Sequence, residues 1–247
     1  MVVLENRVYV YNFADLRLID AIDTCNNPKG LCALNPDGKD SAILVTPASQ
    51  KGFVRIAFYN PHNSNNVFKA HDNAIEAMAL SKNGDILATA SETGTIIRLY
   101  RTEEARLSQT ILPFQEVRRG STNANIHSLI FDNAAIPQYL ACSSDRDTIH
   151  IFVVESNKDQ KLKNPTGNLF QKLAGNDQQK SFAQYALTGK NMNPKCAFSE
   201  DGKQIIIVTQ TGHYYEVQID EKGGILKTVI SQKDLLNTQG KQQIQGT

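Results

Sequence analysis

The sequence lacks tryptophan, contains only four cysteines and has no long apolar run. The cysteines are scattered, at Cys25, Cys32, Cys142 and Cys196, with no Cys-x-x-Cys pair, which argues against a metal site and favours buried free thiols in a reducing compartment. No apolar stretch approaches the roughly 20 residues that a membrane span needs. The first residues do not place a basic flank before an apolar stretch, so no secretory signal is predicted. We therefore expect a cytoplasmic protein that contacts membranes only peripherally.

Net charge is also small. The formal charge is +1 over 247 residues, which argues against bulk electrostatic attraction to nucleic acid. Any anion must then be bound locally, by a few placed cations. A chain of this length forms a single domain in many all-β proteins, and we predict one domain over residues 1–247.

Short alternating apolar runs, broken by polar turns, dominate the chain. Runs such as "RVYVYNF", "ILATASE" and "TIHIFVV" follow the two-residue period of strands, and "SKNGD", "SETGT" and "SEDGK" have the composition of turns. "LSQTILPF" is interpreted in the same way, as the outer strand of its repeat. The order recurs at roughly 40–45 residues, the period of four-stranded propeller blades. The predicted fold is an all-β, WD-repeat-like β-propeller.

The blade count predicts a partial propeller. Four complete blades and the last strands of an earlier one fit between Met1 and the end of the chain. The Trp-Asp pair typical of WD repeats is absent, and Tyr100 and Phe152 stand in its place. We interpret this as a divergent propeller that either lacks its N-terminal part or is completed by a partner, and we favour a missing N-terminal part. Residues 233–247 are expected to form a flexible tail.

Two adjacent arginines, Arg118 and Arg119, precede a predicted strand. Successive side chains of a strand point to opposite faces. Arg118 is therefore expected to face the preceding blade and Arg119 the following one, with Gly120 allowing a sharp turn between blades. Guanidinium groups match phosphate oxygens and stay charged, so two separate anion sites are predicted. The alternative is an ordinary solvated turn or salt bridge.

Hydroxyls and imidazoles flank each arginine and are the groups that complete a phosphate site. The first set is His71, Ser91, Thr93 and Thr95, and the second is Ser143, Ser144, Thr148 and His150. Other interpretations stay open. His71 is equally interpreted as a structural histidine bonded to Ser91, since buried polar groups are paired. His150 alternates with two isoleucines and is expected on the surface, and the two serines also suit a turn.

A long insertion, residues 156–180, follows the strand that contains His150. It is too long for a simple hairpin connection, and such loops are usually functional or disordered. It contains lysines together with the apolar residues Leu169, Phe170 and Leu173, which lie on either side of Lys172. This composition is that of a weak interfacial membrane anchor, and a disordered polar loop is the alternative.

The segment "VRRG", Val117 to Gly120, resembles the Phe/Leu-Arg-Arg-Gly motif of the PROPPINs, β-propellers that bind polyphosphoinositides. "NPKGLCALNP", "KAHDNAIEAMALSKNGDILATASETGTIIRLY" and "CSSDRDTIHIF" resemble further blocks of that family in order. The resemblance implies a seven-bladed propeller of which the first two and a half blades are missing here. It also implies that Arg118 and Arg119, each with its set of helpers, belong to two headgroup sites, and that residues 156–180 face the membrane.

Two residues depart from the family pattern. Val117 is smaller than the usual Phe or Leu, and we expect it still to pack. Arg146 and Asp147 stand where the family usually has Lys-Gly. Asp147 adds negative charge and adopts a positive φ less easily than glycine.

The main hypothesis is a non-enzymatic effector of phosphatidylinositol 3-phosphate and the 3,5-bisphosphate, acting as a scaffold in autophagosome formation. Its expected partners are autophagy proteins, including a lipid-transfer protein, on phagophore assembly site, endosomal or vacuolar membranes. The alternative is a WD-repeat interaction scaffold whose arginines bind an acidic peptide. No nucleophile elbow, metal-ligand spacing or P-loop points to an enzyme, a metal or a cofactor.

Overall fold

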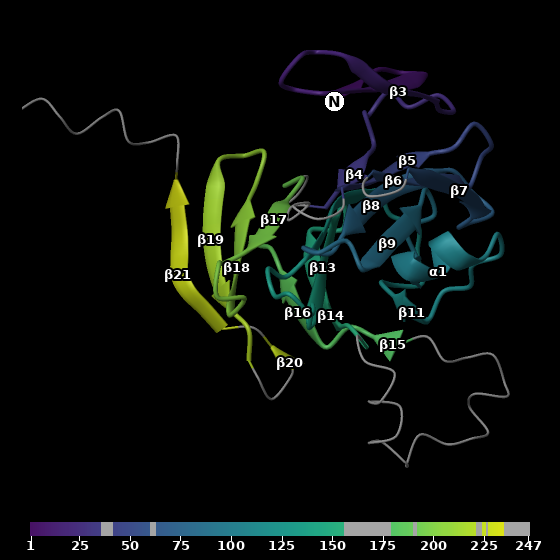
Figure 1. The fold of residues 1–247 in the computed structure, drawn as a ribbon. Coiled ribbons are helices and arrows are strands. Elements are labelled where there is room, and N and C mark those ends of the chain that lie inside the picture. The colour runs from purple at the N-terminus through teal and green to yellow at the C-terminus, as the bar shows by residue number, and fades with distance from the viewer. Residues whose placement is uncertain are drawn as a thin grey trace, which may run out of the picture.

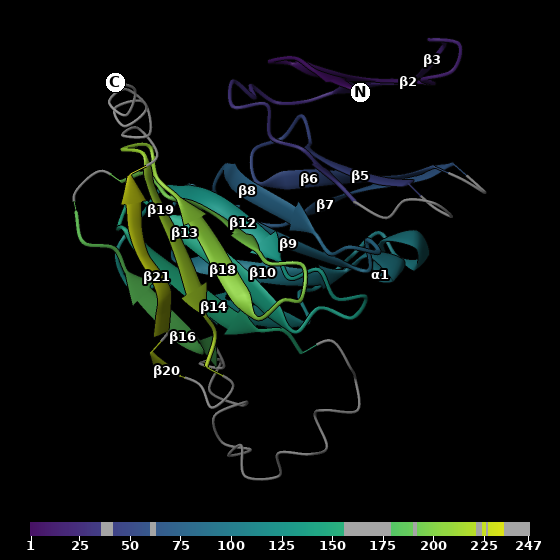
Figure 2. The ribbon, with the colours of Figure 1, turned by 90° about the vertical axis from the view of Figure 1, so that its left-hand side faces the viewer.

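Five β-sheets follow one another around an arc, in chain order (Figure 1, Figure 2). This computed structural model describes residues 1–35, 42–59, 63–155, 179–189, 192–220, 224–225 and 227–234. The predicted membrane-facing segment Leu169, Phe170, Lys172 and Leu173 lies outside the described residues. So does most of the predicted tail, whereas Lys233 and Asp234 belong to a strand.

The first two sheets contain the N-terminal third of the chain. The three-stranded sheet comprises β1 (Val2–Val3), β2 (Arg7–Tyr11) and β3 (Leu18–Asp23). The next, a four-stranded antiparallel sheet, comprises β4 (Ala33–Leu34), β5 (Ala42–Pro47), β6 (Phe53–Tyr59) and β7 (Ser64–Lys69).

The third sheet carries the two arginines. It comprises β8 (Ile75–Leu80), β9 (Ile86–Ser91), β10 (Ile96–Arg101), β11 (Gln115–Arg118) and, beside β11, the short strand β15 (Gln179–Lys180). Helix α1 (Thr102–Leu107) lies between β10 and β11. The fourth sheet comprises β12 (Ile126–Phe131), β13 (Tyr139–Ser144), β14 (Thr148–Val153), β16 (Ala183–Ala186) and β20 (Gly224–Ile225). The fifth comprises β17 (Lys195–Phe198), β18 (Gln204–Val208), β19 (His213–Gln218) and β21 (Lys227–Asp234).

This arrangement confirms the predicted all-β propeller, with a first sheet of three strands and four further sheets of four or five strands among the described residues. The outer strand of the third sheet was wrongly predicted, because "LSQTILPF" is not a strand. The residues before it form α1, where Glu103 and Glu104 in the first turn favour a helix. Of its apolar residues, Leu107 and Leu112 are exposed and Ile111 is buried, without the strict alternation of a strand. The outer strand is β11.

Apolar side chains fill the seams between neighbouring sheets. The seam between the sheets β4–β7 and β8–β11, here called the first seam, is packed with side chains such as Ile56, Phe68 and Leu87. The seam between the sheets β8–β11 and β12–β16, the second seam, contains Ile97, Val117 and Phe152 among others. Full burial of one such side chain stabilises the fold by roughly 1.5–3 kcal/mol. Each strand thus presents alternate residues to the seam before it and the seam after it.

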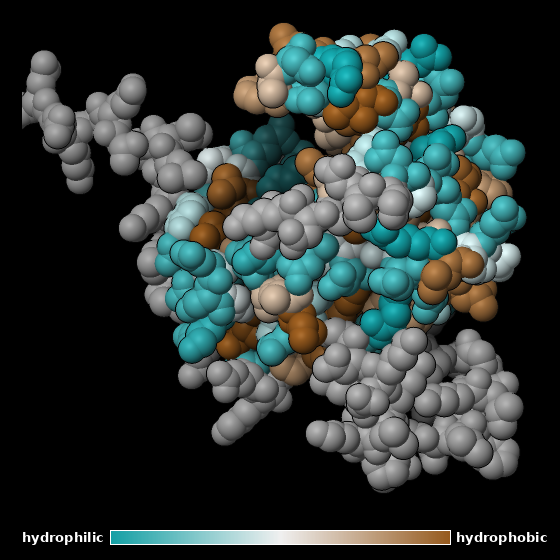
Figure 3. Space-filling model, in the orientation of Figure 1, coloured by the Kyte–Doolittle hydropathy of each residue, from teal (hydrophilic) through white to brown (hydrophobic). Residues whose placement is uncertain are grey.

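Tyr100 and Phe152, which stand in place of the tryptophan of WD repeats, are both buried in these seams. The Tyr100 hydroxyl donates a hydrogen bond to the Ala70 carbonyl, 3.0 Å away, across the first seam. Several large apolar side chains of the β1–β3 sheet and its turn are exposed, such as Phe13 and Leu16. Brown, hydrophobic atoms are visible on this sheet at the top of Figure 3. No described helix has the length and apolarity that crossing a membrane requires.

Candidate functional site

The pleat of β11 separates the two arginines, as predicted. In the register of β10 with β11, Arg118 lies opposite Ile96 and Glu116 lies opposite Arg98. Arg98 bonds to the Ala70 carbonyl across the first seam, so this face of β11, with Arg118, is turned toward the preceding sheet. Val117, on the other face, is fully buried in the second seam, which confirms that valine packs here. Arg119 lies on the Val117 side.

Arg119 is buried, with 5% of its surface exposed. Its Nε donates to the Gly94 carbonyl (2.6 Å) and its Nη2 to the Thr122 carbonyl. Burial lowers the pKa of the guanidinium, which still remains charged at any relevant pH. No described carboxylate forms an ion pair with it within 4 Å. Because a guanidinium has five N–H donors, these two bonds fix its position and leave further donors for an anion.

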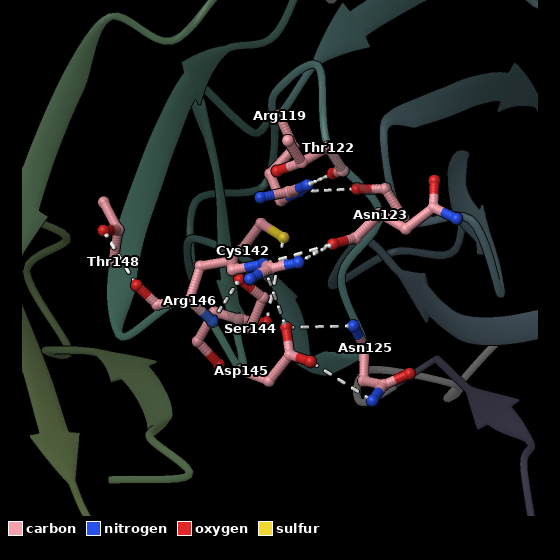
Figure 4. Close-up of polar contacts among 11 residues, drawn as sticks. Arg119, Thr122, Asn123, Asn125, Cys142, Ser144, Asp145, Arg146 and Thr148 are labelled. Carbon is pink, nitrogen blue, oxygen red and sulfur yellow. Dashed lines mark hydrogen bonds and ion pairs between the residues drawn. The ribbon is translucent and has the colours of Figure 1, made fainter. Parts of the chain in front are cut away.

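A second guanidinium lies beside it (Figure 4). Arg146, in the turn between β13 and β14, donates through Nε and Nη2 to the Asn123 carbonyl, at 3.1 and 2.7 Å. Consecutive carbonyls of the segment after Gly120 therefore position both arginines. Sequence reasoning noted Arg146 only as a departure from a family pattern. Its position next to Arg119 depends on a turn that meets another loop, which no local signal reveals.

The carboxylates of this turn offset part of its positive charge, since Asp145 Oδ1 forms a long ion pair with Arg146 Nε at 3.9 Å. Asp145 accepts hydrogen bonds from the backbone and side-chain amides of Asn125, at 3.1 and 3.2 Å. Asp147 adopts a φ of 51°, the left-handed conformation that glycine would favour. Its Oδ1 accepts the Met192 amide at 3.0 Å, a bond that offsets part of the strain and directs the charge toward the next sheet.

Three of the four predicted helpers of Arg119 lie on its side of the fourth sheet. His150 stacks on Phe152 in the second seam, and Ser144 and Thr148 share its face. Ser143 faces the other way and donates to the Pro194 carbonyl at 2.7 Å. The structure therefore does not bring Ser143 to Arg119, because the pleat turns neighbouring serines apart. The expectation of a surface His150 is wrong, since it is 7% exposed.

In the first set, the structural role of His71 is clear, but its partner differs from the prediction. His71 is buried, and its Nε2 lies 3.0 Å from Thr89 Oγ1 rather than bonding to Ser91. The Ser91 hydroxyl is hydrogen bonded to Thr93 Oγ1 at 2.9 Å. Thr95 contributes its carbonyl, which accepts the Arg119 amide at 2.9 Å and thereby links the two sites.

The glycine that this turn requires is Gly94, not Gly120. Gly120 has no positive φ, and a Cβ added there would meet nothing within 4 Å, so the predicted sharp turn does not depend on glycine. Gly94 has a φ of +59°, and a Cβ there would lie 1.9 Å from the Ala124 carbonyl oxygen. Its own carbonyl holds Arg119. A backbone contact of this kind has no signature in the sequence beyond the glycine itself.

The two buried histidines predict an acid-sensitive fold. Burial, followed by the charges of Arg98 for His71 and Arg119 for His150, lowers the pKa of each imidazole to about 4. These histidines stabilise the fold fully above pH 6.5, the ordinary pKa of histidine in an unfolded chain. This stabilisation is lost as the pH falls toward 4, because the unfolded chain then binds protons that the folded protein does not. Between pH 7 and 5 we expect a loss on the order of 2 kcal/mol for each histidine, measured as the free energy of urea unfolding.

A double variant, His71→Gln with His150→Gln, is expected to remove most of this decrease. His213→Gln, which replaces a half-buried histidine, serves as the control. An undiminished pH dependence in the double variant would show that other groups cause it.

Within the described ranges, no group of three or more His, Cys, Asp or Glu side chains is arranged to hold a metal ion. What this region offers is a set of hydrogen-bond donors and positive charge on both sides of one strand. Arg118 and Arg119 point to different seams, with Arg98 and Arg146 nearby. Such an arrangement can bind two anionic groups at neighbouring positions on the propeller rim.

A family model described as PROPPIN matches residues 1–236. Autophagy-related protein 18 of Dictyostelium discoideum is 30% identical over 254 residues, which cover 92% of this chain and 65% of the relative. WD repeat domain phosphoinositide-interacting protein 1 of Xenopus laevis is 27% identical over 256 residues, 96% of this chain and 57% of the relative. The chain thus spans less than two thirds of the length of these relatives.

Among solved structures, Kluyveromyces lactis Hsv2 is similar to this chain with a TM-score of 0.71. The match covers 93% of this chain and 68% of that structure, at 19% sequence identity. At this identity the likeness concerns the fold, and it agrees with the propeller described above.

Proposed function

Because the chain belongs to the PROPPIN family, we propose that it is a non-enzymatic protein that binds phosphoinositide headgroups at membranes and serves autophagy as a scaffold. The names of two relatives, autophagy-related protein 18 and WD repeat domain phosphoinositide-interacting protein 1, support this assignment. We propose phosphatidylinositol 3-phosphate and the 3,5-bisphosphate as its lipids and other autophagy proteins as its partners.

The observation that carries the proposal is the divergence of Arg118 and Arg119 across β11. Inositol phosphates are compact anions with several oxygens, which match the planar fork of a guanidinium. On the Arg119 side, backbone carbonyls already position the guanidinium, so little conformational entropy is lost when a phosphate binds. On the Arg118 side, the hydroxyls of Ser91 and Thr93 lie in the adjoining turn.

Two headgroup sites on one rim give bivalent attachment, and we propose that the segment 156–180 adds a third, interfacial contact. Each contact is weak by itself, whereas linked contacts raise the overall affinity by orders of magnitude. A juxtamembrane lysine contributes about 1 kcal/mol near an anionic surface. The same multivalency makes binding dependent on the density of lipid in the membrane.

Flotation of the unaltered chain with vesicles tests the proposal. We expect it to float with vesicles that contain phosphatidylinositol 3-phosphate or the 3,5-bisphosphate, and to remain in solution with phosphatidylserine vesicles of equal surface charge. Equal flotation on both kinds of vesicle would reveal only general electrostatic attraction. Absence of flotation on either would contradict lipid binding and favour the alternative, a scaffold whose arginines bind an acidic peptide.

A further inference from the structure

A second guanidinium group reaches the Arg119 site from the next sheet (Figure 4). Arg119 follows β11 in the third sheet, whereas Arg146 lies in the turn between β13 and β14 of the fourth. The two side chains donate to the consecutive carbonyls of Thr122 and Asn123, so they meet at one stretch of backbone. Burial lowers the pKa of Arg119, and the charge of Arg146 lowers it further, as expected for two neighbouring cations.

The turn that carries Arg146 is held in place by its own hydrogen bonds. Ser144 Oγ accepts the Arg146 amide at 3.4 Å, and Thr148 Oγ1 donates to the Arg146 carbonyl at 3.2 Å. The Asp147 amide donates to the Ser144 carbonyl (3.2 Å), and Asp147 Oδ1 accepts the Met192 amide (3.0 Å). Two of the predicted helper hydroxyls thus lie around the backbone of Arg146. Because this backbone is already ordered, little conformational entropy is lost when the Arg146 side chain binds an anion.

Both guanidinium groups use the same edge to bind the backbone. Arg119 donates through Nε and Nη2, and so does Arg146. The other edge, formed by Nη1 and the second hydrogen of Nη2, is a planar fork that matches two phosphate oxygens. Among the described residues, no acceptor is hydrogen bonded to Nη1 of either arginine. Each side chain is therefore anchored along one edge and can present the other to an anion.

Neighbouring ionisable groups leave this second edge of Arg146 accessible. Asp145 Oδ1 offsets part of the positive charge, but it lies 3.9 Å from Arg146 Nε, on the edge that binds the Asn123 carbonyl. His150, also buried on this side, adds no charge at pH 7, because burial lowers its pKa to about 4. A bond to the Asn123 carbonyl does not by itself require a cation, since an uncharged amide also donates to a carbonyl. A second guanidinium at this position is therefore better suited to an anionic ligand than to a purely structural bond.

We propose that Arg146 is a further headgroup-binding residue of the site around Arg119, so that two guanidinium groups from neighbouring sheets bind the phosphates of one headgroup. The inference rests on the proposed function and deepens it. The ligand is the phosphorylated inositol of a phosphoinositide. The complete site forms only when the third and fourth sheets pack together, because each sheet supplies one of the two cations.

Substitution of Arg146 by glutamine tests the proposal. Arg146→Gln removes the charge but keeps an amide that can donate to the Asn123 carbonyl, so it spares the structural bond. We expect it to weaken flotation on phosphoinositide vesicles about tenfold, because a charge-assisted hydrogen bond to phosphate is lost. Arg146→Lys, which keeps the charge without the fork, should bind more tightly than Arg146→Gln. Arg17→Gln removes an exposed arginine from the β1–β3 sheet and should leave binding unchanged. Equal binding by Arg146→Gln and the unaltered chain would overturn the proposal.

Calorimetry with the soluble headgroup inositol 1,3-bisphosphate separates headgroup contact from general attraction to the membrane. The proposal requires Arg146→Gln to weaken this interaction as well, and a loss confined to vesicles would overturn it. The unaltered chain keeps the two proposals apart. If it binds phosphoinositide and Arg146→Gln binds equally well, the headgroup site stands and Arg146 is not part of it. If the unaltered chain binds no phosphoinositide, the proposed function itself fails.

Double variants show whether Arg146 belongs to the Arg119 site. In an Arg118→Ala background, Arg146→Gln should remove most of the remaining binding, because it acts on the site that is left. In an Arg119→Ala background it should add little, because that site has already lost its other guanidinium. Equal additional losses in the two backgrounds would mean that Arg146 acts independently of the site, which contradicts the proposal. The urea-unfolding midpoint of each variant identifies any loss of binding that is due to unfolding.

Discussion

Replacing Arg118 and Arg119 together with alanine is expected to abolish flotation on phosphoinositide vesicles. A hydrogen bond to a charged group contributes about 1.5–3 kcal/mol, so removing both guanidinium groups should lower the affinity at least a hundredfold. Each single substitution should weaken binding about tenfold. The two side chains point to different seams, so each substitution leaves the other site intact. Flotation over a series of lipid densities measures this difference.

The control variant must remove the same amount of positive charge at a distance from the two arginine sites. Arg7→Ala with Arg17→Ala removes two exposed arginines from the β1–β3 sheet and should leave flotation unchanged. Arg119 is buried and bonds to two carbonyls, so its loss also affects the fold locally. Arg119→Lys preserves the charge without the planar fork, and its melting temperature shows how much of the effect is structural. Undiminished flotation of the double alanine variant would refute both headgroup sites.

Gly94→Ala is expected to have the largest effect on stability of any single methyl addition in this region. The added Cβ would lie 1.9 Å from the Ala124 carbonyl oxygen, in a backbone conformation that disfavours side chains. Relieving that contact must displace the segment that carries Thr122 and Asn123, whose carbonyls position Arg119 and Arg146. We expect a loss of about 3 kcal/mol in the free energy of unfolding. For a chain of this length, that corresponds to a decrease of roughly 6–12 °C in melting temperature.

Gly120→Ala is the matched control, since the same methyl group there meets nothing within 4 Å and the backbone has no positive φ. It should change the melting temperature by no more than about 2 °C, as surface substitutions usually do. Scanning calorimetry of the two variants makes the comparison directly. If Gly120→Ala proved the more destabilising of the two, the glycine of the arginine motif would have the structural role that the sequence suggested.

Parts of the arginine region follow from local rules. The alternation of a strand is enough to predict that Arg118 and Arg119 diverge and that Val117 is buried. The same rule, applied to Ser143 and Ser144, could have separated them, and it places only Ser144 on the side of Arg119. For His150, alternation correctly predicted a face opposite to Ile149 and Ile151, but not burial. In a propeller each sheet packs between two neighbouring sheets, so both of its faces are buried in seams.

Two-residue periodicity and turn composition were enough to predict the propeller class and the two faces of β11, because both are local properties of the chain. The contacts between segments distant in the chain could not be predicted: Gly94 with Arg119, Arg146 with Asn123, and Gln115 with Gln179. These pairs are 23 to 64 residues apart along the chain. Such contacts depend on how distant segments of the chain fold against each other. Local patterns of residue type do not encode them.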